Sequence, residues 1–166
     1  MKLKAVWSSA CHGLWPFRGV SFYHDGLNAV LTFDYSDYDK HTLFKVCIKF
    51  KSVLGFRNYS EYFGFEEYYA KDYGERHWDD LLKSYVSDLQ WGDLYIVVNS
   101  KELEREKQGD PKRAKLWDLK HYVILFDSAG LFEFFATDFE VMHIGNEELK
   151  DFTVDDMIKV MEEKNK

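Results

Sequence analysis

Residues 120–144, KHYVILFDSAGLFEFFATDFEVMHI, decide the fold of this chain. They contain three apolar runs of strand length, separated by the turn-forming segments Asp127–Gly130 and Thr137-Asp138. Apolar residues occupy both alternating sets of positions, so both faces of these strands are expected to be buried. The segment therefore predicts the centre of an antiparallel sheet, which the rest of the chain covers.

A tight first turn fixes a pairing for these strands. Phe126 is expected to lie opposite Leu131, and the third strand is expected to pair with the second across Thr137-Asp138. The resulting parity places His121 on one face and Glu133 on the opposite face. His121 and His143 share a face, but they lie towards opposite ends of the sheet, too far apart to bind one metal ion.

Alternation and turn signals predict the other strands. Thr42–Lys51 alternates apolar side chains with lysines and Cys47, which is typical of an antiparallel strand with one buried and one solvated face. The sequence His24-Asp25-Gly26 predicts a hairpin, and Gly55 indicates a bulge or a close backbone approach. The expected strands are Lys2–Trp7, Val20–Tyr23, Asn28–Tyr35, Thr42–Lys51, Val53–Tyr59 and Leu94–Val98.

Two helices are expected to pack on this sheet. Trp78–Leu89 has apolar residues at helical intervals, and Thr153 is a suitable N-cap for an amphipathic C-terminal helix. Residues 100–115 form the most charged stretch, predicted as an exposed charged connection in which Ser100 caps a short helix through Leu103. The alternative for this stretch is a docking appendage.

The chain shows no internal repeat, no linker and no alternation of strands with helices, so residues 1–166 are expected to form a single globular domain. The predicted fold class is α+β and predominantly antiparallel β. It is expected as a single twisted sheet or a partly closed barrel, with a C-terminal helix and one further helix packed on it.

Charge and cysteine content restrict the partners. The net charge of −7 disfavours nucleic acid and anionic membranes and favours a basic protein partner. The two cysteines have neither disulfide-framework nor metal-site spacing, which indicates a reducing, cytoplasmic setting. The N-terminal apolar run is too short for a signal peptide, and no run has the length of a membrane-spanning helix.

Catalytic motifs are scarce. The sequence has no phosphate-binding glycine loop, no nucleophile elbow and no paired histidines on a helix, so no cofactor and no metal are predicted. Glu133 is the one candidate catalytic residue, because a carboxylate among apolar neighbours is desolvated and its pKa rises. The alternative is a structural glutamate that faces solvent or pairs with a basic residue such as Arg57.

Residues 59–75 interleave tyrosines with carboxylates and match neither a helical nor a strand period. Tyrosine offers a large rigid contact area, and carboxylates steer a basic partner towards the surface. The alternative is that these tyrosines wrap the edge of the sheet. The expected partner-binding residues are Glu61, Tyr62, Glu66, Glu67, Tyr68 and Tyr69.

These features support three functional hypotheses. The first is a non-catalytic acidic protein-binding domain, such as a bacterial toxin-neutralising immunity-type protein that blocks a basic partner. The alternative is a small-ligand-binding or enzymatic β-barrel with Glu133 in its interior. The third is a structural subunit that oligomerises through a strand edge.

Overall fold

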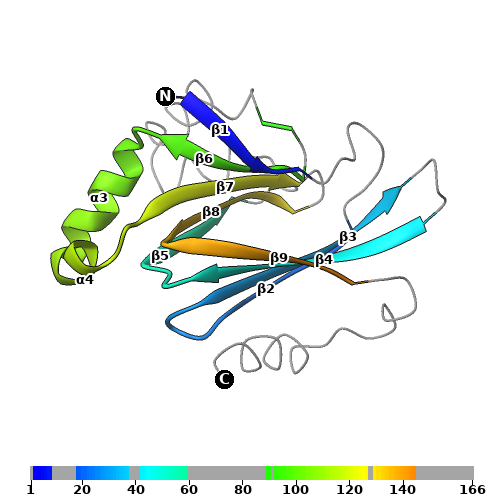
Figure 1. Cartoon of the computed structure of the whole chain (residues 1–166), viewed down its shortest axis with the longest axis horizontal. Coiled ribbons are helices and arrows are strands. Elements are labelled where there is room, and N and C mark those ends of the chain that lie inside the picture. The colour runs from blue at the N-terminus through cyan, green and yellow to red at the C-terminus, as the bar shows by residue number, and fades with distance from the viewer. Residues whose placement is uncertain are drawn as a thin grey trace.

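The computed structural model describes residues 2–8, 18–37, 42–59, 89–90, 92–126 and 129–144. In this part of the chain nine strands form two antiparallel sheets (Figure 1). The five-stranded sheet has the order β1 (Lys2–Trp7), β6 (Leu94–Val98), β7 (Lys120–Phe126), β8 (Gly130–Ala136) and β5 (Gly55–Tyr59). The four-stranded sheet has the order β2 (Arg18–His24), β3 (Ala29–Asp37), β4 (Thr42–Lys51) and β9 (Asp138–Ile144).

The antiparallel α+β class is confirmed, whereas the predicted single twisted sheet is wrong. The described strands divide into two sheets and do not close into a barrel. The predicted C-terminal helix from Thr153 lies outside the described residues, as does the predicted helix Trp78–Leu89 apart from its last residue. Strands Lys2–Trp7, Thr42–Lys51 and Leu94–Val98 have the predicted bounds.

The two sheets pack face to face through aromatic side chains. The rings of Phe50 and Phe134 stack with their centroids 4.0 Å apart, and those of Phe33 and Phe126 are 4.7 Å apart. Alternation along each strand supplies this core, since every second residue faces the opposite sheet. The fully buried members with the largest side chains are Tyr122, Phe33, Phe50, Phe126, Phe134, Leu31, Ile48, Leu94 and Ile124.

The chain passes between the sheets at a double corner. Thr137 alone links β8 to β9, and its N–H and hydroxyl both donate to the carbonyl oxygen of Lys51 at 3.0 Å. Beside it, Leu54 donates to the carbonyl oxygen of Phe135 at 2.8 Å. The predicted pairing of the third strand with the second is therefore wrong, because β9 crosses to the other sheet and pairs with β4.

The register of β7 and β8 differs from the prediction by one residue. Phe126 pairs with Gly130, which has φ 78° and begins the strand instead of completing the turn. A shift of one residue moves every side chain of a strand to the other face relative to its partner strand. Glu133 consequently lies on the same face as His121, not on the opposite face as predicted.

The outer face of β4 is also buried, contrary to the prediction of a solvated face. Cys47 is fully buried, Lys49 is 3 % exposed and Lys45 is 9 % exposed. The ammonium of Lys45 lies 3.5 Å from the carboxylate of Asp34 on the neighbouring strand. Strict alternation predicted the strand and its inner face, but it does not show whether a further layer covers the outer face.

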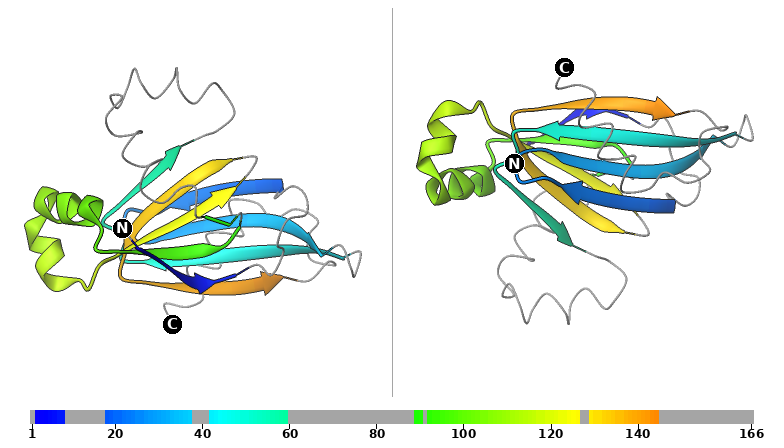
Figure 2. Two further views of the ribbon diagram at one scale, coloured as in Figure 1. Left: turned by 90° about the horizontal axis from the view of Figure 1, so that it is seen from above. Right: turned by 90° about the horizontal axis from the view of Figure 1, so that it is seen from below.

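The connection from β6 to β7 contains two helices, α3 (Lys101–Gly109) and α4 (Pro111–Leu116). Figure 2 shows them projecting at one end of the sandwich, beyond the strands. Ser100 caps α3 by accepting from the N–H of Leu103 at 3.0 Å, as predicted. Most of the stretch predicted as an exposed connection is exposed, but it is helical and its Glu102 is buried.

Candidate functional site

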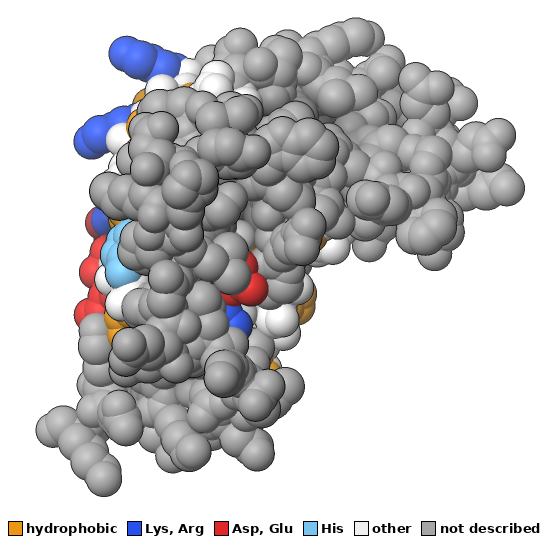
Figure 3. Space-filling view, turned by 90° about the vertical axis from the view of Figure 1, so that its right-hand side faces the viewer, with side chains coloured by type: hydrophobic (Ala, Val, Ile, Leu, Met, Phe, Trp, Pro, Cys, Tyr) orange, Lys and Arg blue, Asp and Glu red, His pale blue; other side chains and the backbone are white. Residues whose placement is uncertain are grey.

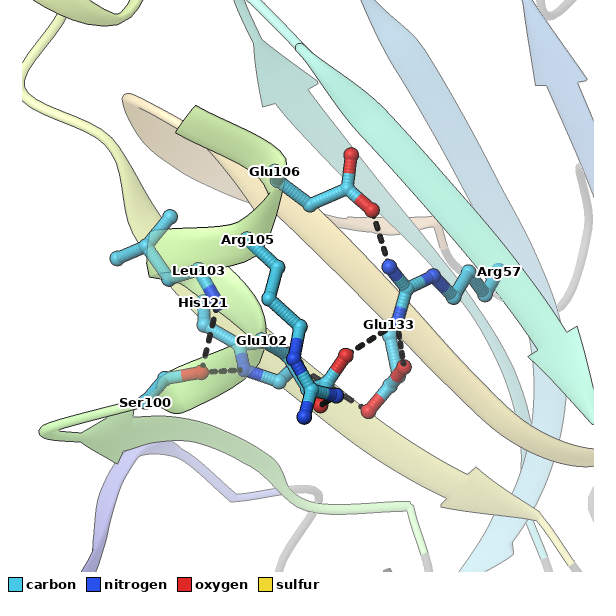
Figure 4. Close-up of polar contacts among 8 residues, drawn as sticks. All are labelled: Arg57, Ser100, Glu102, Leu103, Arg105, Glu106, His121 and Glu133. Carbon is cyan, nitrogen blue, oxygen red and sulfur yellow. Dashed lines mark hydrogen bonds and ion pairs between the residues drawn. The ribbon is translucent and has the colours of Figure 1, made fainter. Parts of the chain in front are cut away.

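Glu133 lies at the centre of a buried charged network on the outer face of the five-stranded sheet (Figure 4). Its side chain is fully buried, although both sequence neighbours, Phe132 and Phe134, face the core between the sheets. The network joins side chains of β5, β7, β8 and α3. Its members are Arg57, Ser100, Glu102, Arg105, Glu106, His121 and Glu133.

The strand register brings the sheet residues of the network together. Arg57 of β5 lies directly opposite Glu133 of β8, and the guanidinium and carboxylate are 3.8 Å apart. His121 of β7 is the diagonal neighbour of Glu133, and its Nε2 lies 3.3 Å from Oε1 of Glu133. Cross-strand and diagonal neighbours on one face are the pairs that interact in a sheet. Glu133 therefore pairs with Arg57, which was the alternative to a catalytic role for Glu133.

Helix α3 contributes the remaining charges. Arg57 donates to Oε2 of Glu102 at 2.9 Å and also bonds to Glu106, one turn further along the helix. Arg105 donates to the other carboxylate oxygen of Glu102 at 2.6 Å. The guanidinium of Arg57 thus contacts three carboxylates, which a planar group with five donors can do.

Gly55 allows α3 to approach the sheet edge this closely. A Cβ atom at this position would lie 3.0 Å from Oε2 of Glu106. A larger residue would require the Glu106 carboxylate to shift by a few tenths of an ångström. The sequence predicted a bulge or a close backbone approach at Gly55, whereas the groups that lie close to it are the side chains of Glu106 and Phe135.

Ser100 and His121 link the cap of α3 to the sheet residue Glu133. Oγ of Ser100 accepts the N–H of Leu103 at 3.0 Å and also forms a hydrogen bond with Nδ1 of His121 at 2.6 Å. A hydroxyl group has one proton and two acceptor positions, so it can bond to both groups at once. On the other side of the ring, Nε2 of His121 lies 3.3 Å from Oε1 of Glu133.

A serine, a histidine and a carboxylate in contact also form the catalytic triad of hydrolases, but this arrangement differs from a triad in three respects. Ser100 is only 3 % exposed, and its hydroxyl is already committed to the helix cap. The ring nitrogens are exchanged, since Nδ1 faces the serine and Nε2 the acid. Glu133 also faces Arg57. The network is therefore built to hold α3 on the sheet.

The sequence identified Glu133 and Arg57, but it did not predict that His121, Glu102 and Glu106 lie in contact with them. The one-residue error in register placed His121 on the wrong face. The helical spacing of Glu102 and Glu106, four residues apart and following a good N-cap, was the available signal. The predicted partner-binding residues Glu61, Tyr62, Glu66, Glu67, Tyr68 and Tyr69 lie outside the described residues.

Three further findings concern a groove beside α3, potential metal ligands and membrane-spanning helices. An open groove of about 740 Å³ runs beside α3, with Val97 and Asn99 on one side and Lys101, Arg105 and Gln108 on the other. Within the described ranges, no group of three or more potential metal ligands is present. No described helix has the length and apolar content needed to cross a membrane.

Comparison with protein-family models, with curated proteins and with solved structures found no match to this chain. The function is therefore argued from its own residues.

Proposed function

We propose that this chain is a non-catalytic protein-binding domain that blocks a basic partner, as a bacterial toxin-neutralising immunity-type protein does. The observation that carries the proposal is the distribution of charge. Residues 60–88 contain eight acidic and three basic residues, and thus hold most of the net charge of −7. Concentrated negative charge accelerates association with a basic surface and orients the encounter.

The described structure supports this proposal through the two points where the acidic stretch is attached. The stretch follows Tyr59, the last residue of β5, only two residues after Arg57 in the buried network. It ends before Leu89, which is 6 % exposed and belongs to an apolar cluster on the outer face of the five-stranded sheet. Two anchored ends reduce the conformational entropy lost on binding.

Within this stretch the proposed contact residues are the six predicted from the sequence. The tyrosines Tyr62, Tyr68 and Tyr69 supply contact area, and the carboxylates of Glu61, Glu66 and Glu67 supply charge. Aromatic residues are enriched among the side chains that dominate binding energy. Charged residues at an interface mainly set the association rate and the choice of partner.

The position of Glu133 gives no support to the ligand-binding or enzymatic barrel. That alternative needs Glu133 inside a barrel, whereas it lies outside the space between the two described sheets. Its carboxylate already faces Arg57 and His121. A general acid or base must instead be able to reach a substrate.

The test is affinity capture from a lysate of the source organism with the whole chain, followed by mass spectrometry. The E66K/E67K variant should lose at least about 90 % of a captured basic protein, since each reversal replaces attraction by repulsion. Calorimetry with that purified protein should show the same loss and a strong dependence on salt.

The matched control is E104K, because Glu104 is 66 % exposed on α3 and pairs only with Lys107 among the described residues. E104K changes the net charge in the same direction without touching the acidic stretch. If no basic protein is captured, or if E66K/E67K and E104K weaken capture equally, the proposed function is wrong.

A further inference from the structure

We propose that α4 is a docking surface for an acidic protein segment that also carries an apolar side chain. We call this surface the α4 tip, formed by Lys112, Arg113, Lys115 and Leu116. It is separate in sequence from residues 60–88, and its charge has the opposite sign. The inference does not depend on the proposed function.

Leu116 is the first element of this surface. It is 81 % exposed, more than any other large apolar residue of the described chain. Lys112 and Arg113 precede it by four and three residues, so two cationic side chains flank it on the same face of the helix, and Lys115 is its neighbour in sequence. An exposed leucine beside cations suits a partner that offers both carboxylates and an apolar contact.

Two of the three cations of α4 differ from the paired cations Lys107 and Arg105 of α3. On α3, Lys107 pairs with Glu104 at 2.9 Å and Arg105 with Glu102 at 2.6 Å. By contrast, Lys112 and Lys115 make no hydrogen bond or ion pair within the described part of the chain. Their charge is available to a second molecule.

Arg113 is held in place by its own helix. Its guanidinium lies 3.5 Å from the carboxylate of Asp110 and 5.7 Å from the ring centroid of Trp117. The side chain is still 52 % exposed, so its remaining donors face outward. A guanidinium fixed in this way loses little entropy when it binds a carboxylate.

The buried network makes the α4 tip a rigid surface. Arg57 fixes α3 to the sheet through Glu102 and Glu106. Asp110 then joins the helices, since its N–H donates to the carbonyl of Glu106 and its carboxylate caps α4 through the N–H of Arg113. The pair projects beyond the strands (Figure 2). A surface held in advance avoids part of the entropy cost of binding.

An acidic protein fits this surface better than other polyanions. A nucleic acid or an anionic membrane extends past the α4 tip and is repelled by the rest of a chain with a net charge of −7, whereas a short acidic segment meets the α4 tip alone. Nucleic acid also offers little apolar surface to cover Leu116. Figure 3 shows the end of the molecule away from α3 and α4, where described basic side chains stand at the upper margin and described acidic side chains lie below them.

The experiment measures binding of the whole chain to a fluorescent amphipathic peptide made of glutamate and leucine. The same peptide with lysine in place of glutamate, phosphatidylglycerol vesicles and duplex DNA are titrated in parallel. The acidic peptide should bind, and K112E/K115E should weaken it at least about tenfold. L116S should weaken it by about three- to tenfold. The matched control L27S, at a leucine 48 % exposed in the β2–β3 turn, should have no effect.

Every other outcome overturns the proposal. Equal binding of the acidic and lysine peptides would exclude charge recognition, and equal loss in L116S and L27S would exclude the role of Leu116. If vesicles or DNA bind through Lys112 and Lys115 while the acidic peptide does not, the α4 tip recognises that polyanion instead. Circular dichroism of each variant shows that the helices and sheets are retained.

Discussion

The two faces of the five-stranded sheet are made by neighbouring residues and hold opposite chemistry. On β7, Tyr122 faces the core between the sheets and His121 faces α3, and on β8 the same contrast separates Phe134 from Glu133. All four side chains are at most 1 % exposed. Burial alone therefore does not distinguish the faces.

The difference between the faces lies in how each is stabilised. The inner face depends on close packing of aromatic rings, which tolerates substitutions that conserve volume. The outer face beneath α3 depends on a set of charges that stabilise the fold only while every member has its partners. Three predictions test this contrast.

Loss of Arg57 should have the largest effect. Arg57→Met leaves the carboxylates of Glu102, Glu106 and Glu133 without their shared guanidinium, which should lower the free energy of unfolding by about 3–5 kcal/mol. The matched control is Lys51→Met, whose 2.5 Å ion pair with Glu140 is over 30 % exposed on both sides. It should cost at most about 1 kcal/mol. Urea unfolding measures both, and equal losses would contradict the contrast.

The inner face should respond to alkaline pH through Tyr122. Burial, with smaller contributions from Asp138 and Asp118, raises the pKa of Tyr122 to about 12 from an ordinary value of 10.0. The folded state therefore keeps a proton that the unfolded state loses, and stability should fall as pH rises from 10 towards 12. The loss should reach about 2–3 kcal/mol.

Comparison with Tyr122→Phe isolates this effect from other titrations. Urea unfolding at several alkaline pH values should show a steeper decline for the natural chain than for the phenylalanine variant. Parallel declines would show that Tyr122 is not held protonated by the fold.

Loss of Ser100 should have the smallest effect of the three. Ser100→Ala removes the cap of α3 and the hydrogen-bond partner of Nδ1 of His121, for a cost of about 2 kcal/mol. Asp110→Ala removes the cap of α4 at an exposed position, for about 1 kcal/mol. Thermal unfolding compares the two caps. If Asp110→Ala costs as much as Ser100→Ala, the contact with His121 adds nothing to stability.

Local patterns predicted much of the fold. Alternation placed strands at Lys2–Trp7, Thr42–Lys51 and Leu94–Val98, and the Asp-Gly turn placed the β2–β3 hairpin. The cap at Ser100 was also predictable, because its hydroxyl serves N–H groups only a few residues away. These features depend on neighbours in the sequence.

The division into two sheets was not predictable in this way, because it depends on partners far apart in the chain. A single residue, Thr137, carries the chain from one sheet to the other. The dipeptide Thr137-Asp138 also suits a two-residue hairpin turn, so the sequence does not distinguish a hairpin within one sheet from a crossing between two sheets. The contact between His121 and Glu133 was also not predicted, because it depends on the exact register between β7 and β8. Taking Gly130 as a turn residue moved His121 away from Glu133, although both side chains were known to lie in the apolar segment.

The double corner at Thr137 has a consequence for folding kinetics. On the two sides of this corner β9 pairs with β4 and β8 pairs with β5, and these pairings bring together residues about 70 to 100 positions apart in the chain. Closing such long loops before any packing is gained makes folding slow. During synthesis, β4 therefore waits without β9, and β5 waits without β8, until these later strands leave the ribosome. In that interval the exposed strand edges are open to aggregation and chaperone binding.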